Sequence, residues 1–349
     1  FTEEIQRLQK PTQGEPAIQV RVVEPALRPE EPVSPSAVRN LALALVLGLL
    51  LGVGAVFLAE SLDTTVKDRH DVERLVGAPV LATVPRIQTG GAEVYLERDP
   101  QSMGAEAFRK VRTAIQFLGV DRPIKVLLIT SPFPREGKTT TALNLAASFA
   151  QAGMKTVLLE ADLRRPTLHR VFASEQEKGL TTCLVGRISL QQAVLPTPVR
   201  NLSHIPAGAI PPNPAELLSS QHMGKVLSAL QAEFDMVVVD APPLLPVADT
   251  PALAHRVDGV LLVARAGQTN RERLRESAEL LQTVGGRLLG VIVNFQRVED
   301  SPEGYQYYGY RSSKQAFESP AGTGRAVAQK ADRPPNGAVS ERGRASKRA

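Results

Sequence analysis

The segment SPFPREGKTT at residues 131–140 is the strongest structural signal in this chain of 349 residues. It follows an apolar run from Ile124 to Ile129 and precedes a helical pattern. A strand, a glycine-containing loop and a helix start in that order predict a P-loop, in which backbone N–H groups and a lysine hold phosphate oxygens. The Gly-Lys-Thr triplet alone is weak evidence, and Pro132 stands where the strict pattern has its first glycine.

Two further apolar runs end in carboxylates that could complete such a site. Residues 157–159 lead into Glu160 and Asp162, and residues 236–239 lead into Asp240. Ligands of parallel sheets lie at the carboxyl ends of the strands, so we expect these acids to share one crevice with the P-loop. Asp162 and Asp240 are candidate metal ligands, Asp240 through the metal's water or the attacking group, and Glu160 is a candidate base. Strand-end or N-cap acids in an ordinary α/β domain are the alternative.

The P-loop residues have expected roles toward ATP and Mg²⁺. Lys138 would reach the β- and γ-phosphates, and the hydroxyl of Thr139 would bind the metal ion. Backbone N–H groups around Glu136, Gly137 and Thr140 would cradle phosphate oxygens at the helix start. The predicted catalytic set is therefore Lys138, Glu160, Asp162 and Asp240.

Strands alternate with helices from residue 124 to residue 295, which predicts an α/β fold of the P-loop NTPase type. Its sheet should be mostly parallel and covered by helices on both faces. Asn294 would end the last strand, where this fold class tends to place a residue that contacts the base. We expect helices at 138–152, 214–232 and 269–284. We expect strands at 124–130, 156–161, 201–205, 235–240, 258–264 and 287–294.

Residues 41–59 contain no charged side chain, and nineteen helical residues nearly span a hydrocarbon core of about 30 Å. We therefore expect one transmembrane helix, with a buried core helix or a signal-anchor remnant as alternatives. Gly48 and Gly52 would allow close helix contact, although a two-glycine match is weak evidence. Flanking charges do not set the direction. The P-loop needs cytosolic ATP, which places residues 1–40 outside the cell.

Composition limits the remaining possibilities. Cys183 is the single cysteine, so no internal disulfide is possible, and the five histidines show no zinc-ligand spacing. The net charge of +5 is concentrated in a basic tail, so we expect no nucleic-acid partner. The chain opens on Phe1 and is expected to be a piece of a longer protein. The expected divisions are a Pro-rich segment at 1–40, the transmembrane helix at 41–59, a linker at 60–104, a catalytic domain at 105–300, a tyrosine cluster at 301–311 and a disordered tail at 312–349.

Together these motifs resemble those of the bacterial tyrosine kinases, a P-loop family unrelated in fold to eukaryotic kinases. Val157–Arg164 resembles the family's second Walker motif, and Asp240-Ala-Pro-Pro resembles its Walker B motif. Glu106, Arg109 and Arg112 match its oligomerisation motif; without the family match, a solvated helix face would be the better interpretation. The chain also carries a cluster that matches the family's C-terminal phosphoacceptors, namely Tyr305, Tyr307, Tyr308 and Tyr310.

The resemblance is to the polysaccharide co-polymerase type, in which one polypeptide carries a periplasmic chain-length domain, two membrane helices and a cytosolic kinase. It implies an autokinase in the inner membrane that regulates exopolysaccharide or capsule polymerisation and export. It also implies a ring of copies whose tails dock in neighbouring subunits, a polysaccharide polymerase or export partner, and a cognate tyrosine phosphatase.

Two positions depart from the family pattern. Glu160 replaces the usual first Asp of the second motif, and Arg135 stands near the phosphates where the family often has glycine. Two other functions stay open. One is a nucleotide-binding scaffold that sets polysaccharide chain length without catalysis. The other is a partitioning-type ATPase, which the absence of a lysine from residues 131–136 disfavours.

Overall fold

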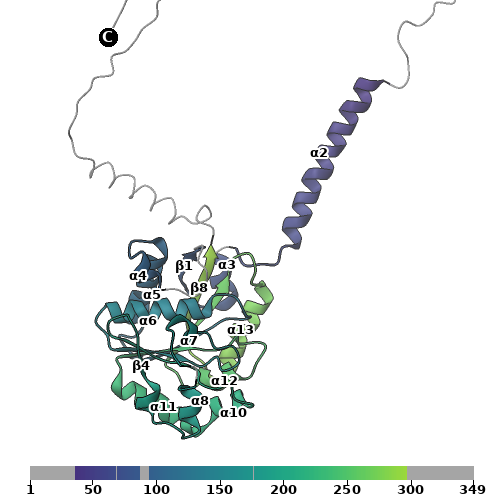
Figure 1. The fold of residues 1–349 in the computed structure, drawn as a ribbon. Coiled ribbons are helices and arrows are strands. Elements are labelled where there is room, and N and C mark those ends of the chain that lie inside the picture. Colours follow the sequence, from purple (N-terminus) through teal and green to yellow (C-terminus); the bar gives the residue numbers. More distant parts are fainter. Residues whose placement is uncertain (1–35, 68, 87–93, 176, 297–349) are drawn as a thin grey trace, which may run out of the picture. The chain divides into compact units, whose positions relative to one another are not determined.

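The computed structural model describes residues 36–67, 69–86, 94–175 and 177–296 (Figure 1). The chain forms two units, one up to Thr64 and one from Thr65 onward. Most of the expected segment at 1–40, the tyrosine cluster at 301–311 and the tail at 312–349 lie outside the described residues.

The first unit contributes helix α2, Ala37–Leu62, which is longer at both ends than the expected 41–59. Ser36 caps its N-terminus by accepting a hydrogen bond from the N–H of Arg39 at 3.4 Å. None of its residues is buried, although most are Leu, Val, Ala or Gly. Within the described ranges, α2 is the one helix with the length and apolar composition to cross a membrane.

The second unit is built on an eight-stranded sheet in the order β1-β8-β7-β2-β6-β3-β5-β4. All neighbouring strands are parallel except β4, which pairs antiparallel with β5. The central strands are buried along their whole length, as expected for a sheet with both faces covered. The strands are β1 Val80–Pro85, β2 Val126–Thr130, β3 Thr156–Glu160, β4 Leu195–Pro196, β5 Leu202–Ile205, β6 Met236–Asp240, β7 Gly259–Arg265 and β8 Leu288–Gln296.

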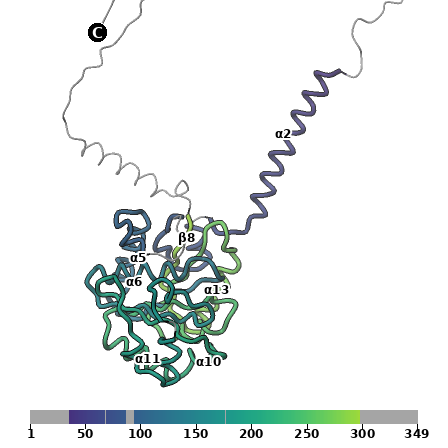
Figure 2. The backbone as a smooth tube through the Cα atoms, in the orientation of Figure 1, coloured from purple at the N-terminus to yellow at the C-terminus, as the bar shows by residue number. Residues whose placement is uncertain are grey.

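Helices cover both faces of this sheet and form two separate cores. One face carries α4 Tyr95–Arg98, α5 Met103–Leu118, α6 Lys138–Gln151 and α7 Leu168–Val171. The other carries α3 Arg69–Val76, α8 Leu180–Leu184, α9 Leu190–Ala193, α10 Pro214–Ser219, α11 Gln221–Glu233, α12 Asp249–Ala254 and α13 Arg271–Thr283. Figure 2 shows α5 and α6 together on one side of this unit and α13 on the other.

The predicted elements are found with small shifts, and three differences have physical causes. The expected linker at 60–104 contains β1, which pairs with β8, so the folded unit begins at Thr65 and not at residue 105. The expected helix 214–232 is two helices, because Ser220 is extended and caps α11 through the N–H of Met223. The two-residue strand β4 is too short to leave a periodic signal.

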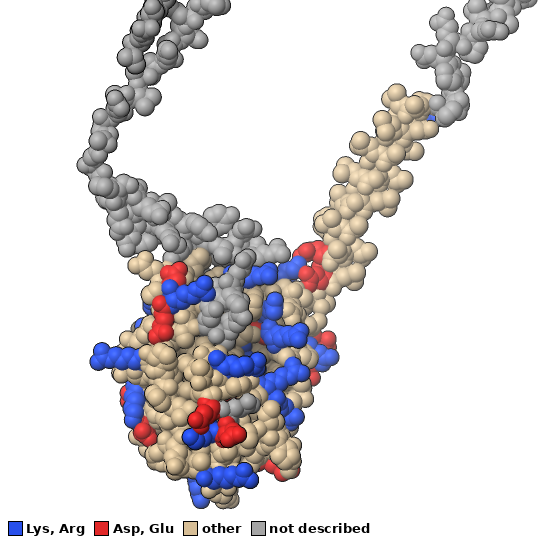
Figure 3. Space-filling model, in the orientation of Figure 1, with Lys and Arg blue, Asp and Glu red and all other residues tan. Residues whose placement is uncertain are grey.

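The surface of this unit mixes both signs of charge. Figure 3 shows Lys and Arg side chains scattered over the visible face with acidic side chains among them. Several of these side chains form ion pairs within their own helix. Arg273 pairs with Glu276 at 2.7 Å in α13, and Arg69 pairs with Glu73 at 3.1 Å in α3. Exposed pairs of this kind contribute only about 0.3–0.5 kcal/mol each, so the buried cores carry the stability.

Candidate active site

The P-loop connects β2 to α6 and points the start of that helix at the carboxyl edge of the sheet. Gly137 is the N-cap of α6 and has a φ of 94°, a conformation that L side chains rarely adopt. A Cβ at this position would also collide with the side-chain amide of Asn294. The fourteen-residue helix that follows leaves its first N–H groups free of intrahelical partners, as a phosphate site requires.

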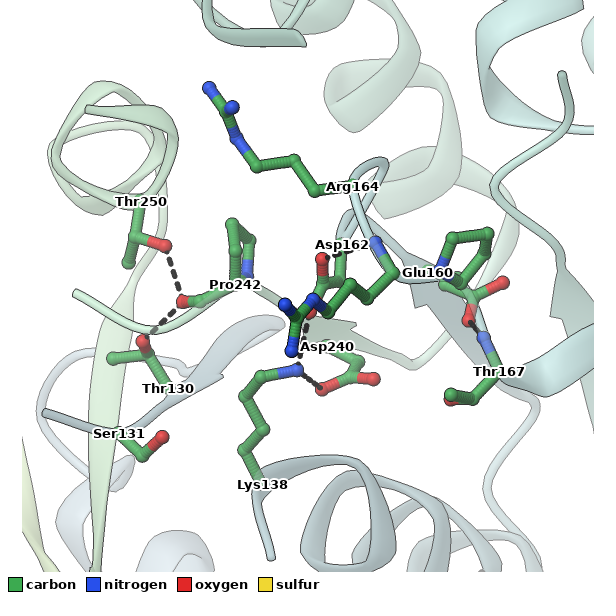
Figure 4. A network of polar contacts seen from close by, with 12 residues as sticks. Thr130, Ser131, Lys138, Glu160, Asp162, Arg164, Thr167, Asp240, Pro242 and Thr250 are labelled. Atoms are coloured by element: carbon green, nitrogen blue, oxygen red, sulfur yellow. Dashed lines mark hydrogen bonds and ion pairs between the residues drawn. The ribbon is translucent and has the colours of Figure 1, made fainter. Parts of the chain in front are cut away.

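Lys138 lies between the two carboxylates that the sequence placed beside it (Figure 4). Its Nζ is 2.6 Å from Asp162 Oδ2 and 3.9 Å from Asp240 Oδ1. Burial acts to lower the pKa of Lys138, but the charges of Asp240, Asp162 and Glu160 outweigh it and leave the pKa above its ordinary value. The lysine therefore stays protonated and available to a negative phosphate.

Asp240 ends β6 and is fully buried. Neither carboxylate oxygen has a partner in hydrogen-bonding geometry, although Lys138 and the hydroxyl of Thr139 lie close enough to stabilise the charged form. Burial raises the pKa of Asp240 to about 6, against the opposing effect of Lys138. Two buried oxygens without hydrogen-bond donors suit a cation or its water shell, so these residues fit a metal-assisted phosphate site.

A metal site formed by protein side chains alone is distinct from one that substrate phosphates complete. Among the residues the structure describes, no group of three or more His, Cys, Asp or Glu side chains could hold an ion. Mg²⁺ commonly binds through one or two carboxylates together with substrate phosphates, so such a cage is not required here.

Glu160 does not fit the expected role of a base. Its Oε1 accepts hydrogen bonds from the N–H groups of Leu168 at 2.8 Å and of Thr167, and its Oε2 accepts one from Ala207 at 3.0 Å. The side chain is fully buried. With both oxygens engaged by backbone donors, the carboxylate fixes the loops after β3 and β5, and it is poorly placed to take up a proton.

Of two other expected nucleotide contacts, Asn294 is buried and Arg135 is exposed. The side-chain amide of Asn294 donates to the carbonyl of Glu136 at 3.2 Å, and its Oδ1 accepts from the N–H of Phe295 at 2.9 Å. Asn294 therefore supports the P-loop with one N–H of its amide, and its contact with a nucleotide base stays a prediction. Arg135 has a φ of 68°, which explains why glycine suits this position.

Sequence reasoning missed the polar network behind the Asp-Ala-Pro-Pro turn. The carbonyl of Pro242 accepts hydrogen bonds from the hydroxyls of Thr130 at 2.7 Å and Thr250 at 2.6 Å. Arg164 forms a bidentate pair with the buried Asp249, at 2.8 and 3.0 Å. The Arg of the second Walker motif was visible in the sequence, but its partner lies 85 residues away and carried no signal.

The expected oligomerisation residues lie on α5. Glu106 pairs with Arg109 at 3.1 Å within the helix. Arg112 donates to the carbonyl of Ser148 on α6 at 2.8 Å. Arg109 also donates to the carbonyl of Pro100 at 2.6 Å, so both arginines are engaged inside one chain, whereas Glu106 is exposed. Assembly through these side chains stays a prediction.

Comparison with known proteins shows where this site belongs. Residues 136–285 match the family model described as "AAA domain", and residues 3–61 match one described as "G-rich domain on putative tyrosine kinase". Tyrosine-protein kinase YwqD of Bacillus subtilis is 44% identical over 215 residues, which are 62% of this chain and 90% of YwqD. The chain belongs to the bacterial tyrosine-protein kinases.

One further relative of this kinase and a solved kinase domain extend the match. Tyrosine-protein kinase etk of Escherichia coli is 31% identical over 296 residues, which are 79% of this chain and 41% of etk. The chain thus spans about four tenths of that relative's length. The solved kinase domain of Escherichia coli ETK superposes with a TM-score of 0.63 at 31% identity, covering 66% of this chain and 95% of that domain.

Proposed function

We propose that this tyrosine kinase binds Mg-ATP at Lys138 and transfers the γ-phosphoryl group to the tyrosine cluster, Tyr305, Tyr307, Tyr308 and Tyr310, of a neighbouring copy. The observation that carries the proposal is the position of Lys138, held between Asp162 and Asp240 at the start of α6. A protonated lysine at a helix N-terminus favours a polyphosphate, and the buried acids beside it favour the accompanying metal ion.

Each residue would act on a different part of the reaction. Lys138 and the first N–H groups of α6 would neutralise phosphate charge, which grows on the leaving group as the bond to the γ-phosphorus breaks. Thr139 and Asp240 would hold Mg²⁺, directly or through water, with Asp162 beside them. When bound, the ion would supply further charge neutralisation and fix the phosphates in line with the acceptor.

In the transfer, one bond to the γ-phosphorus forms as another breaks. A tyrosine hydroxyl oxygen forms a bond to the γ-phosphorus, the bond from that phosphorus to the bridging oxygen breaks, and ADP leaves with the electron pair. The phenolic proton passes to a nearby carboxylate or to solvent. Because both oxygens of Glu160 accept backbone hydrogen bonds, Asp240 is the better candidate to orient or deprotonate the acceptor.

The cluster is a reasonable substrate on composition alone, since it holds four of the five tyrosines of the chain. Each phosphate would add about −1.5 to −2 charges. Several phosphates would turn the neutral tyrosine side chains into an anionic cluster whose members repel one another. A ring-shaped oligomer whose tails dock in neighbouring subunits would then loosen. A cognate tyrosine phosphatase would reset that cycle.

The proposed cellular setting is supported by α2 and by the match of residues 3–61. We propose that α2 crosses the inner membrane, with the residues before Ala37 on the periplasmic side and the folded unit from Thr65 in the cytoplasm, where ATP is available. Similarity to the co-polymerase type supports regulation of exopolysaccharide or capsule polymerisation and export.

Transfer of label from radiolabelled ATP to the full chain tests the proposal, with Lys138→Met as the inactive variant. Lys155→Met is a matched control, because Lys155 is exposed and pairs with Glu233 at 3.2 Å away from the site. Tyrosine labelling that is lost in Lys138→Met and kept in Lys155→Met supports the kinase. Nucleotide binding without labelling would favour the scaffold, and phosphate release without labelling would favour a partitioning-type ATPase.

A further inference from the structure

Glu136 lies inside the P-loop, yet its carboxylate is directed away from solvent. The residue is only 2% exposed. Its Oε2 accepts a hydrogen bond from the N–H of Phe133 at 2.8 Å, and its Oε1 accepts one from the hydroxyl of Thr269. A carboxylate that bridges the loop backbone and a second segment fixes the curvature of the loop.

Thr269 lies in the connection between β7 and α13 and is 3% exposed. Its hydroxyl oxygen accepts a hydrogen bond from the N–H of Arg265 at 2.7 Å. The single hydroxyl proton is therefore directed to Glu136. Valine has nearly the same shape but neither donates nor accepts, so it would leave the buried carboxylate without this partner.

Two more contacts join the same side of the P-loop to the neighbouring strands. The guanidinium of Arg265 on β7 donates to the carbonyl of Arg135 at 3.1 Å. The amide of Asn294 on β8 donates to the carbonyl of Glu136 at 3.2 Å. The backbone at residues 135 and 136 is thus held by β7 and β8, and that of Phe133 by Glu136, immediately before the loop reaches Lys138.

The connection that carries Thr269 is itself braced by the segment that follows α2 in the sequence. The N–H of Val66 donates to the carbonyl of Thr269 at 2.8 Å, and the N–H of Gly267 donates to the carbonyl of Val66 at 2.9 Å. Thr65 forms an isolated antiparallel bridge with Asn270. The position of Thr269 is therefore fixed on two sides, by β7 and by residues 65–66.

We propose that Thr269 and Glu136 are positioning residues for ATP: their hydrogen bond holds the P-loop backbone in its phosphate-binding shape. The inference rests on the proposed binding of ATP at Lys138. Neither side chain has to touch the nucleotide, because each acts through the backbone of residues 133–137. If the loop is ordered for only part of the time, its apparent affinity for the ligand is reduced to that fraction of the affinity of the ordered loop.

Thr269→Val tests this proposal, with Thr269→Ser restoring the hydroxyl and Thr283→Val as the matched control. Thr283 is an exposed residue of α13 whose hydroxyl donates to the carbonyl of Glu279 at 2.8 Å. Dissociation constants for ADP come from titration calorimetry on the full chain, and KM for ATP and kcat come from phosphorylation of the cluster. Thr269→Val removes the hydrogen bond to the buried carboxylate and the one accepted from the N–H of Arg265. We expect an ADP dissociation constant and a KM about tenfold higher in this variant.

The pattern of the constants separates positioning from a general loss of fold. Positioning raises KM for ATP and the ADP dissociation constant, whereas a smaller folded fraction lowers kcat at unchanged KM. Recovery in Thr269→Ser to within about threefold supports the proposal. If Thr269→Val does not fold, Glu136→Gln serves as the variant in its place. Glutamine keeps the volume of the side chain but loses one acceptor oxygen, so we expect the same rise in KM.

Two results would overturn the inference. One is an ADP affinity of Thr269→Val, or of Glu136→Gln in its place, equal to that of the wild type. The other is an equal loss of affinity in Thr283→Val. Failure of the proposed function looks different, since the wild-type chain itself would then bind no ADP or would label no tyrosine.

Discussion

The carboxylate of Glu160 accepts a hydrogen bond from the backbone N–H of Ala207 at 3.0 Å, so the end of β3 is tied directly to the loop after β5. The same carboxylate also accepts from Leu168 and Thr167. A residue at the edge of the active site is thus an anchor for two loops.

Glu160→Gln should destabilise the fold, because an amide group replaces one acceptor oxygen and faces a buried N–H donor. We expect the free energy of unfolding to fall by about 2–4 kcal/mol in urea titrations. Glu233→Gln, at a side chain that is 44% exposed, should change it by less than about 0.5 kcal/mol. An unfolding free energy of Glu160→Gln equal to that of the wild type, with phosphorylation abolished, would instead restore Glu160 to the role of base.

Arg135 occupies a left-handed backbone conformation, with a φ of 68°. Arg135→Gly removes the steric cost of the Cβ there, whereas Arg135→Ala removes the same side chain and keeps that cost. We expect the glycine variant to exceed the alanine variant by about 1 kcal/mol in unfolding free energy. Thermal unfolding of both measures this difference. An alanine variant as stable as the glycine variant would show that position 135 carries no strain.

The stability of the fold should depend on pH through Glu136. Burial raises the pKa of Glu136 from 4.5 to about 7, against hydrogen bonds from Thr269, Phe133 and Ser131 and the charge of Arg265. The folded state therefore binds the proton more tightly than the unfolded chain. This contribution is complete below about pH 4.5 and is lost as the pH rises through about 7.

The measurement is the unfolding free energy of the wild type minus that of Glu136→Gln. We expect it to fall by roughly 3 kcal/mol between pH 4.5 and pH 7, since one pKa unit corresponds to about 1.4 kcal/mol. Glu175→Gln, which alters an exposed side chain, is the control. A difference that stays flat over this range, as in the control, would contradict the burial argument.

Arg112 is expected to stabilise a single chain through its contact with α6. Its guanidinium donates to the carbonyl of Ser148 at 2.8 Å, and Arg112→Ala removes that donor. We expect a loss of about 1–2 kcal/mol in the unfolding free energy, and none in Arg122→Ala at an exposed turn. Analytical sedimentation of Arg112→Ala measures its oligomeric state. Dissociation of an oligomer with an unchanged unfolding free energy would favour a contact of Arg112 between chains.

The fold was predictable where the chemistry is local. Apolar runs that end in Asp or Glu marked β3 and β6, and both acids beside Lys138 were placed correctly because parallel strands share one carboxyl edge. Strand β1 was missed, since a six-residue edge strand after a linker gives no sign of which strand it joins. Its partner β8 begins about 200 residues later in the chain.

The contacts of the site residues were less predictable, because their hydrogen-bond partners lie in segments that are distant in the sequence. Glu160 was expected to be a base from its spacing to Asp162, but the donors that engage it belong to residues 167, 168 and 207. Asn294 was expected at the nucleotide base, which stays a prediction; its support of the P-loop is seen only from the approach of β8 to Gly137. Periodicity and motif spacing carry no information on such contacts.

Peptide mapping of phosphotyrosine by mass spectrometry, on the full chain incubated with Mg-ATP, tests the central claim most directly. Tyr95 is an internal control, because it lies on α4 with its ring stacked on Phe108 at 6.4 Å between centroids. We predict phosphate on Tyr305, Tyr307, Tyr308 and Tyr310, none on Tyr95, and none anywhere in Lys138→Met. Unmodified cluster tyrosines in a chain that binds ATP, or modification that persists in Lys138→Met, would contradict the account.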